Sequence, residues 1–383
     1  MTLRAAFSSL RRQTSSGFYL PELDGLRFIA ILSVFLYHLA GDVLRHSPSA
    51  PLPDSFLFRL TQQLNVGVSL FFCISGMILA LPFARHYLQG APPVPIKKYL
   101  LRRVTRLEPP YLFALLLFFL LKLAGSRGEL AQMLPHLWAS MGYLHNLIYR
   151  SPSTIDFVAW SLEVEIQFYL LAPLLAMVFA IRAAWLRRAI ILLAAVFAAG
   201  LNAWHPSAFV RLTLAGNIQF FLMGFLLVDI FLSHPPNMRE SFRWDFMSFL
   251  GWPAFACFLV FCPTWHTVVL PFFIFALYLA VFYGKLAKKF LASLWISVIG
   301  GMCYTIYLLH NYLIALAGMV TERVGQGLPF AMKLLLQFVL ISPFVLLVSA
   351  IYFRLIEQPC MQPDWPTRFK IRVQRQLGIS SAS

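Results

Sequence analysis

Two basic side chains in the first long apolar run could bind an anion and move a proton. The run contains Leu23-Asp24-Gly25-Leu26-Arg27 and continues to His38. A helix turns about 100° and rises ~1.5 Å per residue, so this eleven-residue spacing puts Arg27 and His38 on one face, roughly 16 Å apart. An imidazole titrates near neutral pH and can take a proton from a hydroxyl group. His38 is therefore a candidate general base, although helix anchoring and packing are the simpler reading of this pair taken alone.

Acidic side chains interrupt a later apolar run just after Trp160. Glu163, Glu165 and Gln167 stand near its start, and a carboxylate inside a membrane needs a partner or a polar cavity. Glu163 and Glu165 lie ~200° apart around a helix, so only one of them is expected to enter a shared pocket. The sequence leaves open which one does. Pairing with Arg27 or another basic group is one explanation, and ligand binding or proton handling is the preferred one.

A basic stretch at 97–106 could bind an anionic partner. Arg103 and Arg106 are three residues apart and share a helical face. Guanidinium groups there could hold the phosphates of a nucleotide carrier, and the same cluster could bind lipid headgroups. Both readings stay open.

Small and polar residues mark three further places. Ser75-Gly76 interrupts an apolar run, which favours close helix packing over a hydroxyl contact to a ligand. A second imidazole, His310, follows a Tyr-rich stretch at 304–307. Arg354 and Glu357, three residues apart, are expected to pair with each other.

The elements that position these residues must be transmembrane helices. Of the 383 residues, 60% are hydrophobic and only 12% charged, whereas a soluble domain carries about 25% charged residues. The net charge of +16 is dispersed between apolar runs, so no nucleic-acid partner is expected. The 5 cysteines are scattered without metal-ligand spacing, and no metal site is expected.

Ten apolar runs are long enough to approach the ~30 Å hydrocarbon core of a bilayer. They lie at about 26–44, 66–83, 109–124, 158–181, 189–204, 212–232, 247–262, 267–283, 296–318 and 334–356. Residues 130–149 are expected to be re-entrant or interfacial. With both ends in the cytoplasm, 23 of the 31 Lys and Arg residues fall on the inner side, as the positive-inside rule requires. The fold class predicted is an all-α polytopic bundle of about ten spans.

Three domain limits follow from this arrangement. We expect a cytoplasmic tail at 1–20, a transmembrane domain at 21–360 and a basic cytoplasmic tail at 361–383. The first 19 residues have no apolar core, so no cleavable signal peptide is expected. A stand-alone membrane domain is predicted.

Taken together, these stretches resemble the integral-membrane acyltransferase-3 family. The matching blocks occur in family order at 23–27 with His38, 67–76, 102–111, 160–169, 304–310, and Glu357 with Pro359. The resemblance implies transfer of acyl groups to sugars and other hydroxylated acceptors. It also implies that Arg27 and His38 are essential with His38 as the base, that Arg103 and Arg106 handle the acyl donor, and that Glu165 is the conserved acid.

The chain departs from the family pattern at a few positions. Ser69 stands where Asp is usual, Glu108 where Tyr is frequent, and Glu163 and Ile166 where a small residue and a second Glu are common. The first and third of these departures alter the charge near the expected cavity, so they bear on the choice of acceptor rather than on the reaction class.

The reaction expected from the resemblance starts with cytoplasmic acyl-CoA, preferably acetyl-CoA, as a co-substrate without a permanently bound cofactor. Arg27, Arg103 and Arg106 hold its phosphates, and His38 deprotonates a hydroxyl group of a carbohydrate or glycolipid acceptor, with Glu165 or His310 orienting the imidazole or the acceptor. Direct transfer and an acyl-histidine intermediate both stay open. Asp24, Ser75, Trp160, Tyr169 and His310 are expected to bind substrate or support the site.

The expected location is the inner membrane of a bacterium, in contact with membrane lipids. Intramembrane acids and histidines would also suit a proton-coupled exporter of a small anion or sugar. The six ordered blocks favour the enzyme, and no duplication of the two halves supports a transporter.

Overall fold

The computed structural model describes residues 10–11, 19–46, 55–125, 130–234, 240–362, 365 and 367. Regular structure in these ranges is helical, and they contain no strand. The predicted tails at 1–20 and 361–383 fall almost entirely outside the described residues, so the domain limits stay predictions.

Nine helical segments in these ranges are long and apolar enough to cross a membrane. They are α2 (Pro21–Arg45); α3 (Phe56–Thr61), η1 (Leu64–Val66) and α4 (Gly67–Gln89) together; α5 (Ile96–Gly125); η2 (Phe157–Ala159), α8 (Trp160–Leu175) and η3 (Ala176–Ala180) together; α9 (Ala184–Trp204); α12 (Phe242–Phe261); η6 (Pro263–Trp265) with α13 (His266–Tyr283); α16 (Cys303–Thr321); and α17 (Phe330–Tyr352), η7 (Phe353–Glu357) and α18 (Gln358–Cys360) together.

The predicted sixth span coincides with α11 (Ile218–Ser233), which is apolar but has only 16 residues. The polytopic all-α bundle is therefore confirmed, and the cytoplasmic placement of the two ends stays a prediction. α5 begins at Ile96 rather than near 109, because Lys and Arg are good helix formers and the basic stretch makes its first turns. Residues 130–149 form α6 (Leu130–Met141) and α7 (His145–Tyr149), both too short to span a bilayer.

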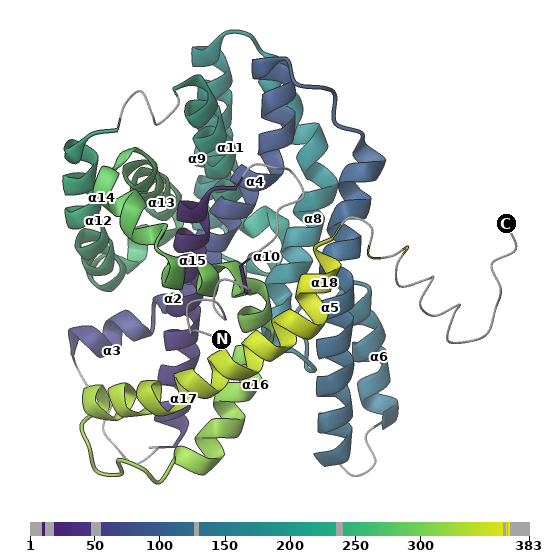
Figure 1. The fold of residues 1–383 in the computed structure, drawn as a ribbon, viewed down its shortest axis with the longest axis vertical. Helices are drawn as coiled ribbons and strands as arrows, with labels where there is room; N and C mark the ends of the chain where they lie inside the picture. The colour runs from purple at the N-terminus through teal and green to yellow at the C-terminus, as the bar shows by residue number, and fades with distance from the viewer. Residues whose placement is uncertain are drawn as a thin grey trace, which may run out of the picture.

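The remaining connections contain four more short helices. They are α10 (Ala208–Arg211), η4 (Leu214–Gly216), α14 (Lys285–Leu291) and α15 (Leu294–Gly301). Figure 1 shows α2 in the middle of the bundle, with α12, α13 and α14 at one side, α5 and α6 at the other, and α17 crossing obliquely.

Glycines bring two pairs of helix backbones into close contact around the centre of the bundle. A Cβ added at Gly76 of α4 would lie 2.2 Å from the carbonyl oxygen of Phe221 on α11. A Cβ added at Gly300 of α15 would lie 1.7 Å from the carbonyl oxygen of Asp24 on α2. Small residues at helix crossings allow this approach, so Gly76 has the packing role that the sequence favoured.

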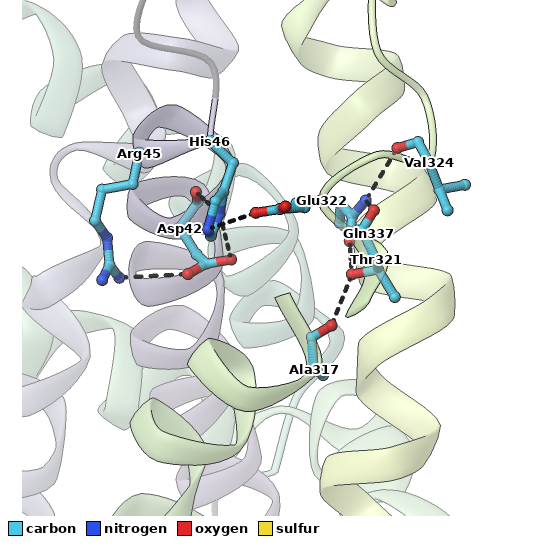
Figure 2. A network of polar contacts seen from close by, with 8 residues as sticks. All are labelled: Asp42, Arg45, His46, Ala317, Thr321, Glu322, Val324 and Gln337. Atoms are coloured by element: carbon cyan, nitrogen blue, oxygen red, sulfur yellow. Dashed lines mark hydrogen bonds and ion pairs between the residues drawn. The ribbon is translucent and has the colours of Figure 1, made fainter. Parts of the chain in front are cut away.

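A polar network joins the C-terminal ends of α2 and α16 (Figure 2). His46, just after α2, approaches Asp42 Oδ2 through Nδ1 and Glu322 Oε2 through Nε2, each at 3.4 Å. On the other side of the network, Thr321 Oγ1 donates to Gln337 Oε1 of α17 at 2.6 Å. His38 of α2 packs against His310 of α16, and His46 after α2 approaches Glu322 after α16. Residue numbers therefore rise in the same direction along both helices, and α2 and α16 run parallel.

Candidate active site

A cavity of about 120 Å³ lies between α2, α4, α5, α8, α16 and η7. Its apolar wall comes mainly from α4. Its polar wall contains Arg27, Ser75, Arg103, Arg106, Ser161, Glu165, Tyr169, Cys303, Tyr304, Tyr307 and Glu357. Six of the residues selected from the sequence therefore meet in one cavity, although they come from four helices.

Arg27 reaches the cavity from the first turns of α2. The helix begins with Pro21 at its first position and has Glu22 and Asp24 in its first turn, which suits the positive end of a helix dipole. Asp24 forms an ion pair with Arg27, and the Arg27 residue is 7% exposed. Asp24 supports the arginine and is not part of the cavity wall.

Arg103 and Arg106 project from the basic first half of α5. The Arg103 guanidinium lies 5.7 Å from the ring centroid of Tyr99 and 5.9 Å from that of Tyr169, within cation–π range. Tyr169 thus helps to hold Arg103. The Arg106 Nε is buried and has no hydrogen-bond partner among the described residues, so it is available to an anionic ligand.

The two acids of α8 face different surroundings, as their angular separation predicts. Glu165 lines the cavity, and its Oε1 accepts a hydrogen bond from Ser75 Oγ at 2.6 Å. Glu163 Oε2 accepts from the backbone N–H of Asn146 at 2.8 Å, at the first turn of α7. Gln167 follows Glu163 and accepts from the N–H of Leu214 at 2.9 Å. Glu165 is therefore the acid of the cavity, whereas Glu163 holds neighbouring backbone.

Trp160 supports this region without lining the cavity. Its carbonyl accepts from Asn146 Nδ2 at 2.8 Å, and its ring packs edge-on against Phe72 with centroids 6.3 Å apart.

His38 and His310 lie outside the cavity wall but next to each other. Their ring centroids are 5.0 Å apart with an interplanar angle of 65°. Tyr307 lines the cavity and precedes His310 by one helical turn, and its hydroxyl lies 2.7 Å from Ser161 Oγ and donates to the Val158 carbonyl at 3.1 Å. The imidazole pair therefore follows directly beyond Tyr307.

The sequence reasoning missed Glu357 as a cavity residue. Glu357 is 1% exposed, lines the cavity and accepts a hydrogen bond from Thr305 Oγ1 at 2.5 Å. Arg354 is exposed. The expected pairing of Glu357 with Arg354 stays a prediction. The signal for the cavity was the place of Glu357 in the last matching block of the sequence. Cys303, Tyr304 and Tyr307 were also missed as wall residues, since single residues of these types are ordinary in apolar helices.

Comparison with models of known protein families assigns the chain to one family. A model of the acyltransferase-3 family, an acyltransferase domain, matches residues 20–354, and the chain belongs to this family. Its apolar helices and this membership make it an integral membrane protein.

Individual relatives are distant. The O-acetyltransferase OatA of Staphylococcus aureus is 31% identical over 167 residues, which are 41% of this chain and 24% of OatA. A putative O-acetyltransferase of the same species is 27% identical over 166 residues, 41% of this chain and 24% of that protein. The matched region thus spans about a quarter of these relatives. No solved structure matches the chain.

Proposed function

We propose that the protein transfers an acyl group, preferably acetyl, from acyl-CoA to a hydroxyl group of a carbohydrate or glycolipid. The observation that carries this proposal is the convergence of Arg27, Arg103 and Arg106 on one cavity, with the His38–His310 pair next beyond it. Family membership and the names of the relatives support acyl transfer as the reaction class.

The three arginines suit an anionic donor. Guanidinium groups bind phosphate oxygens through charge-assisted hydrogen bonds, and CoA carries phosphates at one end and a thioester at the other. The distance of roughly 16 Å along α2 between Arg27 and His38 is of the order of a pantetheine arm. The phosphates can stay at the arginines while the thioester reaches the imidazole.

His38 acts as the general base in this proposal. It takes the proton of the acceptor hydroxyl while the hydroxyl oxygen forms a bond to the thioester carbonyl carbon. The carbon–sulfur bond then breaks, and the sulfur leaves as a thiolate that receives the proton from His38. The products are the ester and free CoA, so no further reactant is needed.

Glu165 is assigned to substrate orientation in the cavity. Its Oε1 is bound to Ser75, and it stands on the same wall as the three arginines. A carboxylate there partly balances their charge and positions the donor by hydrogen bonding. We assign the acyl-CoA end of the cavity to the cytoplasmic side of a bacterial inner membrane. The predicted excess of Lys and Arg residues on that side supports this orientation.

A transfer assay on the full-length protein tests the proposal. The protein is reconstituted in liposomes with radiolabelled acetyl-CoA and the glycan and membrane fraction of source cells that lack the gene. The wild type should move label into the glycan fraction and release CoA, and His38→Ala should reduce transfer to background. His205→Ala, at an exposed position after α9, is the matched control and should behave as wild type.

Two results would contradict this function. Transfer at the wild-type rate by a folded His38→Ala protein would remove His38 as the base. Flux of a small anion or sugar across the liposome, without label in any acceptor, would favour the exporter.

A further inference from the structure

The hydrogen bonds of His310 fit only one neutral tautomer of its imidazole. Its Nδ1 lies 2.7 Å from the carbonyl oxygen of Tyr307 and 3.1 Å from that of Ile306. Carbonyl oxygens only accept hydrogen bonds, so Nδ1 must carry the proton. The neutral ring then has a lone pair at Nε2, which can act only as an acceptor.

That acceptor is buried and lacks a partner. His310 is fully buried, and no described residue hydrogen-bonds its Nε2. Buried polar atoms without a partner are uncommon and call for an explanation. Two titratable rings pack against His310: that of His38, with its centroid 5.0 Å away, and that of Tyr307, 5.7 Å away. The Tyr307 hydroxyl donates to the Val158 carbonyl, so His38 is the candidate donor to Nε2.

We infer that His310 is a positioning residue that accepts a hydrogen bond from His38 during acyl transfer. This inference rests on the proposed function. When one nitrogen of His38 takes the proton of the acceptor hydroxyl, the other carries an N–H that can be donated to His310 Nε2. The proton on His38 passes to the leaving sulfur as described above, and His310 gains and loses none.

The interaction would be strongest when His38 is charged. A neutral His38 can leave His310 Nε2 unpaired, as in this structure, whereas an imidazolium has two N–H donors and needs two acceptors. An interaction that forms with the transferred proton lowers the barrier rather than tightening substrate binding. Many catalytic bases are oriented in this way by a third group.

A neutral imidazole suits this position in the membrane. A carboxylate at the same depth would be costly without a permanent partner, whereas the ring is held by two backbone carbonyls. Tyr307 supplies one of these carbonyls, and its hydroxyl is fixed by Ser161 and Val158. The network of Asp42, His46 and Glu322 joins α2 and α16 farther along (Figure 2), which keeps the two imidazoles side by side.

The test compares two amide variants in the transfer assay described above. In His310→Gln, the side-chain oxygen can reach the position of Nε2, so an acceptor for His38 is kept. In His310→Asn, the shorter amide reaches only the position of Nδ1. Both variants are polar and uncharged, so differences in folding should be small.

We expect His310→Asn to lower kcat on the order of 100-fold, the lower range for loss of a general-base contribution. The KM for acetyl-CoA should stay within about twofold of the wild-type value, because the cavity that contains the three arginines is unchanged. A lowered kcat with an unchanged KM is expected when an interaction is made only in the transition state. The kcat of His310→Gln should be at least about tenfold higher than that of His310→Asn. A merely structural role would lower thermal stability and donor affinity together.

Other outcomes would overturn the inference. Equal kcat values for folded His310→Gln and His310→Asn would show that an acceptor at Nε2 is not needed, and so would a wild-type kcat for His310→Asn. Failure of the proposed function gives a different result: either a folded His38→Ala protein transfers label at the wild-type rate, or the wild type itself transfers no label to any acceptor.

Discussion

Arg106 provides the sharpest test of donor binding, because its buried Nε has no hydrogen-bond partner among the described residues. Replacing Arg106 with Gln removes the charge and shortens the side chain. A hydrogen bond to a charged group contributes about 1.5–3 kcal/mol, and each 1.4 kcal/mol is a factor of ten in affinity. We therefore expect Arg106→Gln to weaken acetyl-CoA binding about 10- to 150-fold.

The cavity contains its own reporter for this measurement. Cys303 lies in the cavity wall, so bound acetyl-CoA should protect its thiol from alkylation by N-ethylmaleimide. Peptide mass spectrometry then gives the alkylated fraction at each acetyl-CoA concentration, and the midpoint gives an apparent Kd. Cys257, which is exposed on α12, should be alkylated at the same rate with and without acetyl-CoA.

Arg102→Gln is the matched control, since Arg102 is exposed on the same helix and does not line the cavity. It should change the Kd less than twofold. If Arg106→Gln bound acetyl-CoA as tightly as wild type, the arginine cavity would not be the donor site. If both variants weakened binding equally, the basic stretch would act as a diffuse cationic surface, as in binding to lipid headgroups.

Three further predictions concern the same framework. Thermal unfolding in detergent should show that Glu163→Ala destabilises the protein by about 1–3 kcal/mol, the cost of an unpaired buried amide. Glu165→Ala should instead chiefly lower acyl transfer. The reverse pattern would exchange the roles of the two acids. Gly76→Ala places a methyl group 2.2 Å from a backbone oxygen, so folded yield by size-exclusion chromatography should fall sharply, whereas Gly41→Ala, with no atom within 4 Å, should express as wild type. Burial raises the pKa of Asp156, just outside the span that begins at Phe157, to about 7. The folded state then binds more protons than the unfolded state between about pH 4 and 7, so stability should fall as pH rises through this window; the melting temperature of Asp156→Asn should lack this slope, and an unchanged slope would assign it elsewhere.

The helical bundle could be predicted because hydrophobic length alone identifies most membrane spans. The limits of a helix could not be predicted where the helix is longer or shorter than the apolar run in the sequence. α5 extends through a basic stretch that an apolar criterion rejects. The apolar run at 212–232 contains α11, which has only 16 residues, most of them buried.

Residues of the site could be selected from sequence, but their surroundings could not. Helical geometry separated Glu163 from Glu165, yet only packing decides which side of α8 faces the cavity. Glu357 shows what spacing alone leaves out. Its spacing from Arg354 predicted a local pair, which stays a prediction, but gave no sign that the carboxylate lines the cavity. The chain forms a π-helical turn at 353–357, so α-helical spacing does not tell which side of this turn faces the cavity.

The order of side chains along α2 and α16 gives a physical reason for separating binding from chemistry. Charged groups meet at one level, where Arg27 is paired with Asp24 and shares the cavity with Glu165. Three turns farther along α2, the titratable groups in contact are imidazoles, which can stay neutral until a proton arrives. A permanent charge at that depth would need a permanent partner. In the proposed mechanism His38 becomes charged when it takes the substrate proton, so the cost of that charge would arise at the moment when His310 Nε2 can offset it.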